Sequence, residues 1–320
     1  MKKFLVGLAA LITILPALSS AAQLLVLNKS DSTLSFIDPV SGKSSMTIPT
    51  GEGPHEIELS SDGRLAFVSN YGADVAGNTL SVIDVAARKE QTRADLGDLR
   101  RPHGLTFTNG QLYFTAEDSR SIGRYNPKSQ RVDWTFETDQ GRTHMVIASR
   151  DGSKLFASNM GSNTISVIER GAHHDWRQTL ISVGEGPEAI DLSPDGRELW
   201  TAHSGDGGVS IIDAASDKAI ATFDAKTKRS NRLKFTPDGR LVLISDLSGG
   251  ELVIVDARKR VELARLKLGK SPTGILIPND EQAYVAVSGD NHIAVIDLKT
   301  RDIAKTIKTG NSPDGMAWVR

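Results

Sequence analysis

Hydrophobic and polar positions follow the same order seven times along this chain. The unit is clearest in Gly184–His203, where a Gly-Pro pair precedes a short apolar run, a Ser-Pro-Asp-Gly turn and a second apolar run. Proline presets φ in such a turn, aspartate bonds its local backbone and glycine accepts positive φ, so the two runs are expected to form hairpin-linked strands. Variants recur about every 41 to 48 residues, beginning at Gly53, Arg101, Arg142, Ser230, Ser271 and, truncated, near the C-terminus.

Each unit contains two further strand signals. A β-branched run that ends in an acidic residue follows the hairpin, as in Asn78–Asp84 and Asn163–Glu169, and a fourth run such as Ala219–Phe223 comes after a short polar connection. No segment sustains a helical period, and Gly, Asn and Asp separate the runs. Four strands in each repeat of this length predict an all-β fold, a seven-bladed β-propeller with four-stranded blades.

The two ends of the chain complete one blade together. Residues Gln23–Pro49 contain the second, third and fourth strands of a blade, and the missing first strand is supplied by Pro313–Arg320. Pairing of the N- and C-terminal strands closes the ring and removes exposed sheet edges. We therefore predict one propeller domain over residues 23–320.

Residues 1–22 have the pattern of a signal peptide. Lys2 and Lys3 precede the apolar segment Phe4–Leu18, and small residues follow at Ser20–Ala22. The apolar segment is short for a membrane span. We expect a periplasmic or secreted protein with no membrane span after processing. The chain contains no cysteine, which excludes disulfides, thiolate metal sites and covalently attached haem.

Several motifs resemble a known family. NTLSVIDV, NTISVIE, LAFVSN, LFASN and SPDGRELW resemble the YVTN-repeat β-propeller family, whose members are commonly exported. At the level of the fold, the chain also resembles the haem-carrying propeller domains of periplasmic nitrite reductases. Such propellers include binding proteins, lactone-cleaving enzymes, lyases and haem carriers, so the resemblance implies a fold rather than one activity.

Aligning the repeats places polar side chains in two rings at one mouth of the central channel. The residue after the proline position is polar in every blade: His55, His103, His144, Glu188, Asn231, Thr273 and Asp314. The ends of the second strands give another ring: Asn28, Asn70, Glu117, Asn159, His203, Asp246 and Ser288. We predict a polar ligand site at this mouth.

Three consecutive histidines suggest several kinds of chemistry. His55, His103 and His144, with Glu188 beside them and His203 on the neighbouring ring, offer nitrogen and oxygen ligands for a divalent transition metal such as zinc or copper. The same imidazoles could act singly as acid or base, or supply an axial ligand to non-covalent haem. Repeat alignment alone leaves these alternatives open.

The loops that lead into the first strands are basic. Arg101, Arg142 and Arg229 occupy them, together with Arg100, Lys226, Lys228, Arg232 and Lys270. Such a rim is suited to a carboxylate or phosphate. Nucleic acid is not favoured, because 38 basic residues face 39 acidic ones and Tyr71 alone offers an aromatic stacking surface near this mouth.

Two groups of polar residues have structural explanations. The loop that contains His173, His174 and Trp176 is expected to decorate the opposite face. Asp38, Asp84, Asp213, Asp256 and Asp297 recur after the third strands, as turn formers do.

The sequence leads to two functional hypotheses. The first is a monomeric exported propeller that binds a small, anionic molecule or a partner protein at the channel mouth. The alternative is a metal- or haem-associated enzyme, a lactone hydrolase, lyase or redox accessory protein, that uses the histidines. The sequence leaves open whether the protein is an enzyme.

Overall fold

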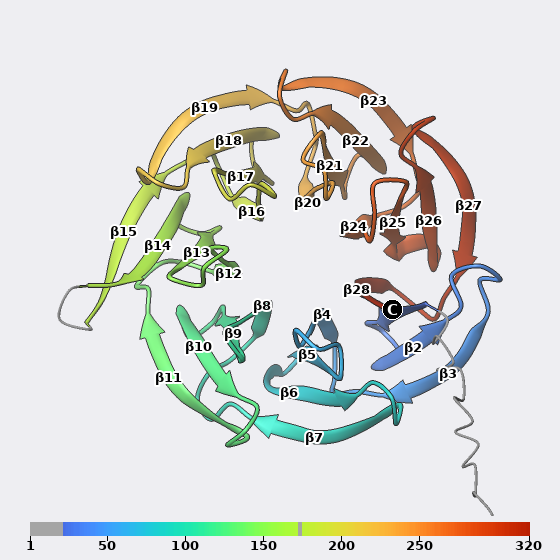
Figure 1. Ribbon diagram of the computed structural model, residues 1–320, viewed down its shortest axis with the longest axis horizontal. Coiled ribbons are helices and arrows are strands. Elements are labelled where there is room, and N and C mark those ends of the chain that lie inside the picture. Colours follow the sequence, from blue (N-terminus) through green and yellow to red (C-terminus); the bar gives the residue numbers. More distant parts are fainter. Residues whose placement is uncertain (1–21, 172–174) are drawn as a thin grey trace, which may run out of the picture.

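The computed structural model describes residues 22–171 and 175–320 and shows seven four-stranded antiparallel sheets around a central channel (Figure 1). This confirms the predicted all-β propeller. The proposed signal peptide, apart from its last residue, and the histidines at 173 and 174 lie outside the described residues. No helix within the described residues is long and apolar enough to cross a membrane.

Each blade runs from an inner strand at the channel to an outer strand at the rim. The inner strands are β28 (Pro313–Val319), β4 (Pro54–Leu59), β8 (Pro102–Thr108), β12 (Thr143–Ala148), β16 (Pro187–Leu192), β20 (Ser230–Phe235) and β24 (Pro272–Leu276). The second strands are β1 (Gln23–Asn28), β5 (Leu65–Gly72), β9 (Gln111–Ala116), β13 (Lys154–Asn159), β17 (Glu198–His203), β21 (Leu241–Asp246) and β25 (Gln282–Val287).

The outer half of each blade repeats with the same regularity. The third strands are β2 (Thr33–Ile37), β6 (Ala76–Asp84), β10 (Ser121–Asn126), β14 (Thr164–Arg170), β18 (Gly208–Asp213), β22 (Glu251–Asp256) and β26 (His292–Asp297). The outer strands are β3 (Ser44–Pro49), β7 (Lys89–Asp95), β11 (Arg131–Glu137), β15 (Trp176–Ser182), β19 (Lys218–Asp224), β23 (Val261–Lys267) and β27 (Asp302–Lys308). A 3-10 turn, η1 (Ser288–Asp290), follows β25.

The turn residues do what their chemistry predicts. Asp195 accepts the backbone N–H of Arg197 at 3.1 Å, and Gly196 has a φ of 76°. The aspartates after the third strands are turn formers as well: Asp213 accepts the N–H of Ser216 at 2.7 Å. These carboxylates are committed to local backbone, so they are part of the scaffold.

The hydrophobic core is a ring of layers between neighbouring blades. In one layer Trp200 and Val209 of the fifth blade pack with Leu233 and Val253 of the sixth. Second strands such as β25 bury five successive residues because both faces of each sheet are covered. Outer strands alternate or are largely exposed, as in β7.

The termini close the ring as predicted. β28 pairs antiparallel with β1, with Leu24 opposite Trp318 and Leu25 opposite Ala317. Figure 1 shows the C-terminal strand at the channel side of the first blade. The blade therefore depends on hydrogen bonds between the two ends of the chain.

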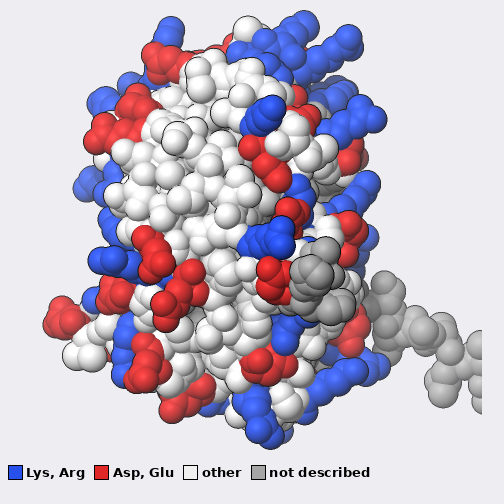
Figure 2. Space-filling model, turned by 90° about the vertical axis from the view of Figure 1, so that its left-hand side faces the viewer, with Lys and Arg blue, Asp and Glu red and all other residues white. Residues whose placement is uncertain are grey.

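The outer wall offers no concentrated apolar surface among the described residues. Its exposed apolar side chains, including Leu180, Ile220, Val261 and Ile303, belong to different blades. Figure 2 shows one side of the ring, where charged residues of both signs gather along the edges and the middle carries few charges. The features that distinguish this propeller therefore lie at its channel.

A bulge and a hydroxyl group fix the channel end of each inner strand. The register of β8 shifts between Pro102 and Leu105, which leaves the N–H of Gly104 without a partner from the sheet. The hydroxyl of Thr115 accepts that N–H at 2.9 Å and donates to the carbonyl of His144 in the next blade at 2.6 Å. One buried hydroxyl thus ties two neighbouring inner strands together, and we call it an interblade staple.

The staple recurs in other blades. Ser158 accepts the N–H of Met145 at 3.2 Å and donates to Glu188 at 3.4 Å. Ser245 accepts the N–H of Arg232 at 3.0 Å and donates to Thr273 at 2.8 Å. The carbonyls that accept these hydroxyls belong to residues of the predicted inner ring, so the staples set the spacing of that ring.

Deleting Pro313–Arg320 should cause aggregation or a large loss of thermal stability. The deletion removes the inner strand of the first blade and exposes the edge of β1, and stacked blades share a continuous core. Size-exclusion chromatography and a thermal melt measure the effect. Deleting the exposed Arg320 alone is the control. A truncated protein that melts within about two degrees of wild type contradicts ring closure by β28.

Thr115→Val should lower the free energy of unfolding by roughly 2–4 kcal/mol, because it leaves a buried N–H and a buried carbonyl unpaired. Thr201 provides a control: it is equally buried in the second strand β17, one register position away from that of Thr115, and its hydroxyl has no partner among the described residues. Thr201→Val should be neutral or slightly stabilising. Urea unfolding of both variants tests this, and equal effects would refute the staple.

Candidate functional site

The structure brings the whole predicted inner ring into one cavity of about 360 Å³ at the channel mouth. We call this cavity the cup. Its lining includes the seven ring residues His55, His103, His144, Glu188, Asn231, Thr273 and Asp314. Lys29, Tyr71, Arg142 and Arg229 also line it. A cavity of this size is at the small end of the range for ligand pockets.

Three imidazoles form a row along one wall of the cup. The ring centroids of His55 and His103 lie 4.2 Å apart, and those of His103 and His144 lie 3.8 Å apart. The ring of Tyr71 meets His55 and His103 edge-on at 5.5 and 5.7 Å. Neighbouring inner strands are therefore close enough for residues of consecutive blades to act together.

Carboxylates hold the two ends of this row. Asp314 lies 3.0 Å from Nδ1 of His55, and Glu117 contacts Nδ1 of His144. Tyr71 donates its hydroxyl to the other oxygen of Glu117 at 2.5 Å. Burial raises the pKa of Glu117, but the bonds from His144 and Tyr71 outweigh it and hold the pKa at about 2. Glu117 is therefore a carboxylate that orients His144.

The middle imidazole, His103, is buried and lacks a hydrogen-bond partner at either ring nitrogen within the described residues. Burial lowers its pKa well below 6.5, and the neighbouring imidazoles of His144 and His55 lower it further. His103 is therefore neutral at physiological pH. Buried polar atoms without partners are rare in native proteins, so both nitrogens are candidates for contact with a ligand.

A buried ion pair crosses the channel one residue deeper than the cup. Arg232 of β20 donates to Glu56 of β4, although the two strands belong to blades that are not neighbours. The side chain of Arg232 is 4% exposed. The prediction that Arg232 belongs to the basic rim is therefore wrong, because the bulge turns this side chain into the channel.

This ion pair was not predicted from the sequence, although both residues occupy the same register position of their blades. Other blades carry Gly104, Met145, Ala189, Gly274 or Gly315 there. Opposite charges at one position of two repeats are a signal that repeat alignment could have detected.

The second predicted ring is mainly structural. Asn70 donates to Thr79 and Ser81, both at 3.0 Å, and accepts the N–H of Gly51 at 3.1 Å. Asn28 and Asn159 make equivalent bonds to the third strands of their blades. These asparagines satisfy buried groups and do not line the cup. The prediction that Glu117 belongs to this ring is wrong. Pro102 lies opposite Ala116, as Pro54 lies opposite Asn70, so Ala116 holds the ring position and Glu117 follows it, at the position of Tyr71.

His203 was predicted to belong to the site, but it lies outside the lining of the cup. Its Nδ1 is 2.9 Å from Asp206, and burial lowers its pKa. Glu188 lies in the cup as predicted. It accepts a bond from Asn231 at 2.5 Å and lies 3.8 Å from Arg229, so its contacts are on the side of the cup away from His144.

The predicted basic rim is only partly directed at the cup. Arg142 and Arg229 line it, whereas the guanidinium of Arg101 lies over the ring of Tyr71 at 4.7 Å and pairs with Asp118 at 3.7 Å. Lys29 was not predicted from the sequence. It lines the cup 3.9 Å from Asp314, and its position directly after Asn28 of the second ring was the available signal.

Two groups of side chains could hold a metal ion. Ligand atoms of His103, Glu117 and His144 lie within 4.8 Å of one another, and so do those of His55, Glu56 and His103. The predicted set of three histidines is therefore divided between two groups that share His103. Each group adds a glutamate that the sequence did not assign to the metal.

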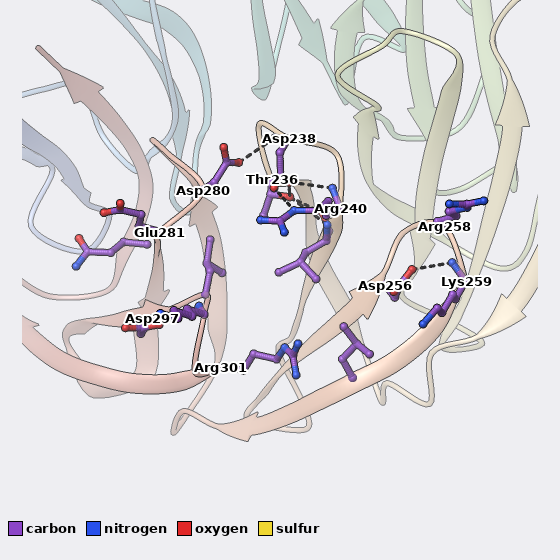
Figure 3. Close-up of a pocket in the computed structure, with 15 residues that line it drawn as sticks. Thr236, Asp238, Arg240, Asp256, Arg258, Lys259, Asp280, Glu281, Asp297 and Arg301 are labelled. Carbon is purple, nitrogen blue, oxygen red and sulfur yellow. Dashed lines mark hydrogen bonds and ion pairs between the residues drawn. The ribbon is translucent and has the colours of Figure 1, made fainter.

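A larger hollow of about 940 Å³ lies at the opposite end of the sixth and seventh blades (Figure 3). Its lining comes from the turns between first and second strands and between third and fourth strands. Figure 3 shows Asp280 directed at Asp238, whose N–H it accepts at 2.8 Å, and Asp256 bound to Lys259. These carboxylates cap turns, so we assign this hollow to the scaffold.

Comparisons with known proteins agree with this architecture. Residues 139–278 match the family described as Cytochrome D1 heme domain. The chain is 24% identical over 176 residues to the Uncharacterized protein YncE of Salmonella typhimurium. This alignment covers 54% of this chain and 50% of that protein. The chain is 29% identical over 165 residues to Dihydro-heme d1 dehydrogenase of Pseudomonas aeruginosa, covering 47% of this chain and 32% of that protein. The alignments thus span half or less of these relatives.

Solved structures show the same fold over most of the chain. The periplasmic gluconolactonase PpgL of Pseudomonas aeruginosa has a TM-score of 0.77 at 18% identity and covers 93% of this chain and 99% of its own. Hydrazine synthase of Kuenenia stuttgartiensis has a TM-score of 0.70 at 19% identity, with coverages of 82% and 88%. The chain is a seven-bladed β-propeller that resembles YncE over part of its length and the Cytochrome D1 heme domain over residues 139–278, which confirms the resemblance.

Asp314→Asn should lower the free energy of unfolding at pH 7 by about 2 kcal/mol. Burial raises the pKa of Asp314, but His55, Lys29 and Arg232 hold it at about 2 instead of 3.8. Because the folded-state pKa is the lower one, the carboxylate stabilises the fold above pH 3.8 and loses this contribution as the pH falls towards 2.

Urea unfolding of the wild type and of Asp314→Asn between pH 7 and pH 2.5 measures the difference between their free energies of unfolding. It should shrink as the pH falls. Asp118→Asn, which changes an exposed rim carboxylate, is the control and should have little effect at any pH. A difference for Asp314→Asn that does not depend on pH would contradict the assignment.

Proposed function

We propose that this propeller binds a small anionic molecule in the cup, with its negative group at Arg142, Arg229 and Lys29 and its body against the imidazole row. The observation that carries the proposal is His103, a buried neutral imidazole with no partner at either nitrogen within the described residues. A ligand that hydrogen-bonds to His103 would satisfy a group that otherwise costs stability.

The basic side chains that line the cup, Lys29, Arg142 and Arg229, favour an anionic small molecule over a cationic one. One oxygen of each carboxylate of the cup already has an internal partner, since Asp314 lies at His55 and Glu188 accepts from Asn231. The side chain of Arg229 is 47% exposed beside the cup, so it can turn towards a ligand. A carboxylate or phosphate offers the oxygen geometry that guanidinium groups bind best.

A sugar acid such as gluconate is a suitable anionic probe. PpgL, which has the same fold, is described as a gluconolactonase. A neutral imidazole can accept a proton from an attacking water, so the cup contains a group capable of general base catalysis. Export to the periplasm, expected from residues 1–22, is supported by the periplasmic location of that protein.

A haem-type cofactor is the second candidate, because residues 139–278 match the Cytochrome D1 heme domain. The donor set fits: Nε2 of His144 and both nitrogens of His103 have no partner among the described residues, and Arg142 and Arg229 are placed for carboxylates. The volume of about 360 Å³ is small for a tetrapyrrole, which the cup would not enclose. Bound haem would supply redox chemistry, and these residues would bind and orient it.

Replacing Arg142 and Arg229 together with alanine should weaken gluconate binding at least about tenfold. Calorimetry with gluconate in EDTA, at low and high salt, measures this, and wild-type binding should also weaken at high salt. Arg101→Ala is the matched control, because its guanidinium lies over Tyr71 outside the cup. The folding of all variants should be unchanged, since exposed charges contribute little to stability.

A parallel titration with hemin, followed by absorbance, separates the second candidate from the first. Hemin binding that is lost in His144→Ala, without gluconate binding, favours the haem carrier. If neither probe binds the wild type, or if gluconate binds the double variant as tightly as wild type at both salt concentrations, the anion proposal is wrong.

A further inference from the structure

Three buried donors meet at the wall of the cup between the third and fourth blades. They are His103 of β8, His144 of β12 and Glu117, which directly follows β9. Their exposed fractions are 2%, 5% and 4%. One ligand atom from each lies within 4.8 Å of the others. Two nitrogen donors and one carboxylate oxygen thus lie together in a site with little access to water.

The free atoms of this group point to a ligand that is a Lewis acid. His103 has two nitrogens without partners, and Nε2 of His144 is also buried without one in the part of the chain that the structure describes. Because Glu117 lies at Nδ1 of His144, the lone pair of that ring is at Nε2, and neutral His103 offers one more, so two buried nitrogen lone pairs on adjacent rings are available to one acceptor. A metal ion accepts electron pairs from several imidazoles at once, provided that the carboxylate balances part of its charge.

The site is rigid because one staple fixes all three donors. The hydroxyl of Thr115 bonds to the N–H of Gly104, the residue after His103, and to the carbonyl of His144. Thr115 is itself two residues before Glu117 on the same chain segment. Tyr71 holds the second carboxylate oxygen of Glu117 at 2.5 Å. The donors are therefore positioned by the fold before any ligand binds, as metal sites require.

We propose that His103, His144 and Glu117 form a binding site for one divalent transition-metal ion. Two imidazoles and a carboxylate suit ions such as zinc, and they disfavour magnesium and calcium, which prefer oxygen ligands. Both glutamates have partners, but that of Glu56 is the guanidinium of Arg232, which already balances its negative charge. The partners of Glu117 are His144 and the neutral hydroxyl of Tyr71, so its charge and further lone pairs remain for an ion, and the group with His55 and Glu56 is less suitable. Three protein ligands leave a coordination position for water or an anion.

This site shares the cup with the proposed anion site but does not depend on it. An ion at His103 would add positive charge under Arg142 and would strengthen anion binding. Binding of the anion in the absence of metal would support the first proposal alone, and binding of the metal in the absence of the anion would support the second alone. The two experiments therefore use different probes, gluconate in EDTA for the first and zinc chloride in a chloride buffer for the second.

Zinc titration of the full chain, purified without an affinity tag and stripped with EDTA, tests the site. Calorimetry should show about one equivalent of tightly bound zinc. His103→Ala should abolish this binding, and Glu117→Gln should weaken it at least about tenfold. Zinc should raise the melting temperature of the wild type and leave that of His103→Ala unchanged. Absorbance with cobalt should report nitrogen and oxygen coordination.

Two controls separate the cup from other histidines. His292→Ala changes a histidine at the start of β26, and a double alanine variant at His173 and His174 covers the loop outside the described residues. Both should bind zinc like wild type. If His103→Ala is poorly folded, Glu117→Gln, checked by circular dichroism, decides the question. Absence of tight zinc binding in the wild type, or unchanged binding in both cup variants, overturns the proposal.

Discussion

The close approach of seven inner strands around one axis is the constraint on which the rest of the structure depends. A Cβ atom on Gly104 would lie 2.6 Å from the Cα of Met145, and one on Gly315 would lie 2.6 Å from the carbonyl oxygen of His55. Side chains larger than hydrogen would push the strands apart at these points. The glycines permit contact, and the interblade staples hold it, so residues of successive blades converge on the channel.

This convergence places charges and imidazoles where water is scarce, so nearly every polar group needs a partner. Arg232 meets Glu56 across the channel, and His55 and His144 each meet a carboxylate. Paired buried charges add little net stability, but an unpaired one is costly. Among the described residues of this network, His103 has no partner at either of its polar atoms, so its wall of the cup is where a ligand would be most strongly required.

Residues that recur at one position of several blades and residues that break this repeat have different roles in the propeller. Asn70, Asn28 and Asn159 repeat because each donates to a serine hydroxyl of the third strand in its own blade. Ala116 holds the equivalent place in the third blade, and Glu117, the next residue, has its carboxylate at His144 in the fourth. The repeat thus defines a scaffold against which a single substitution can create a site, without any inserted catalytic loop.

The sequence by itself determined the strands, the turns, the closure of the ring and the membership of the inner ring. The turns depend on local chemistry, since a glycine such as Gly196 accepts a positive φ in any context. Ring closure depends on the repeat, since the first blade lacks an inner strand of its own and β28 is the inner strand that remains for it. Repeat register then converts position along the chain into position around the axis, which is why all seven predicted ring residues line one cavity.

Only the tertiary structure decided which of these residues meet. The repeat register places His103 beside His144. It does not give the distance of 3.8 Å between their ring centroids, and it does not show that the carboxylate of Glu117 contacts His144. Both features depend on how closely the blades pack. The pairing of Arg232 with Glu56 joins residues 176 apart, across a channel whose width no local pattern encodes. Local preferences fix the elements, whereas partners across the axis are fixed by the closure of the whole ring.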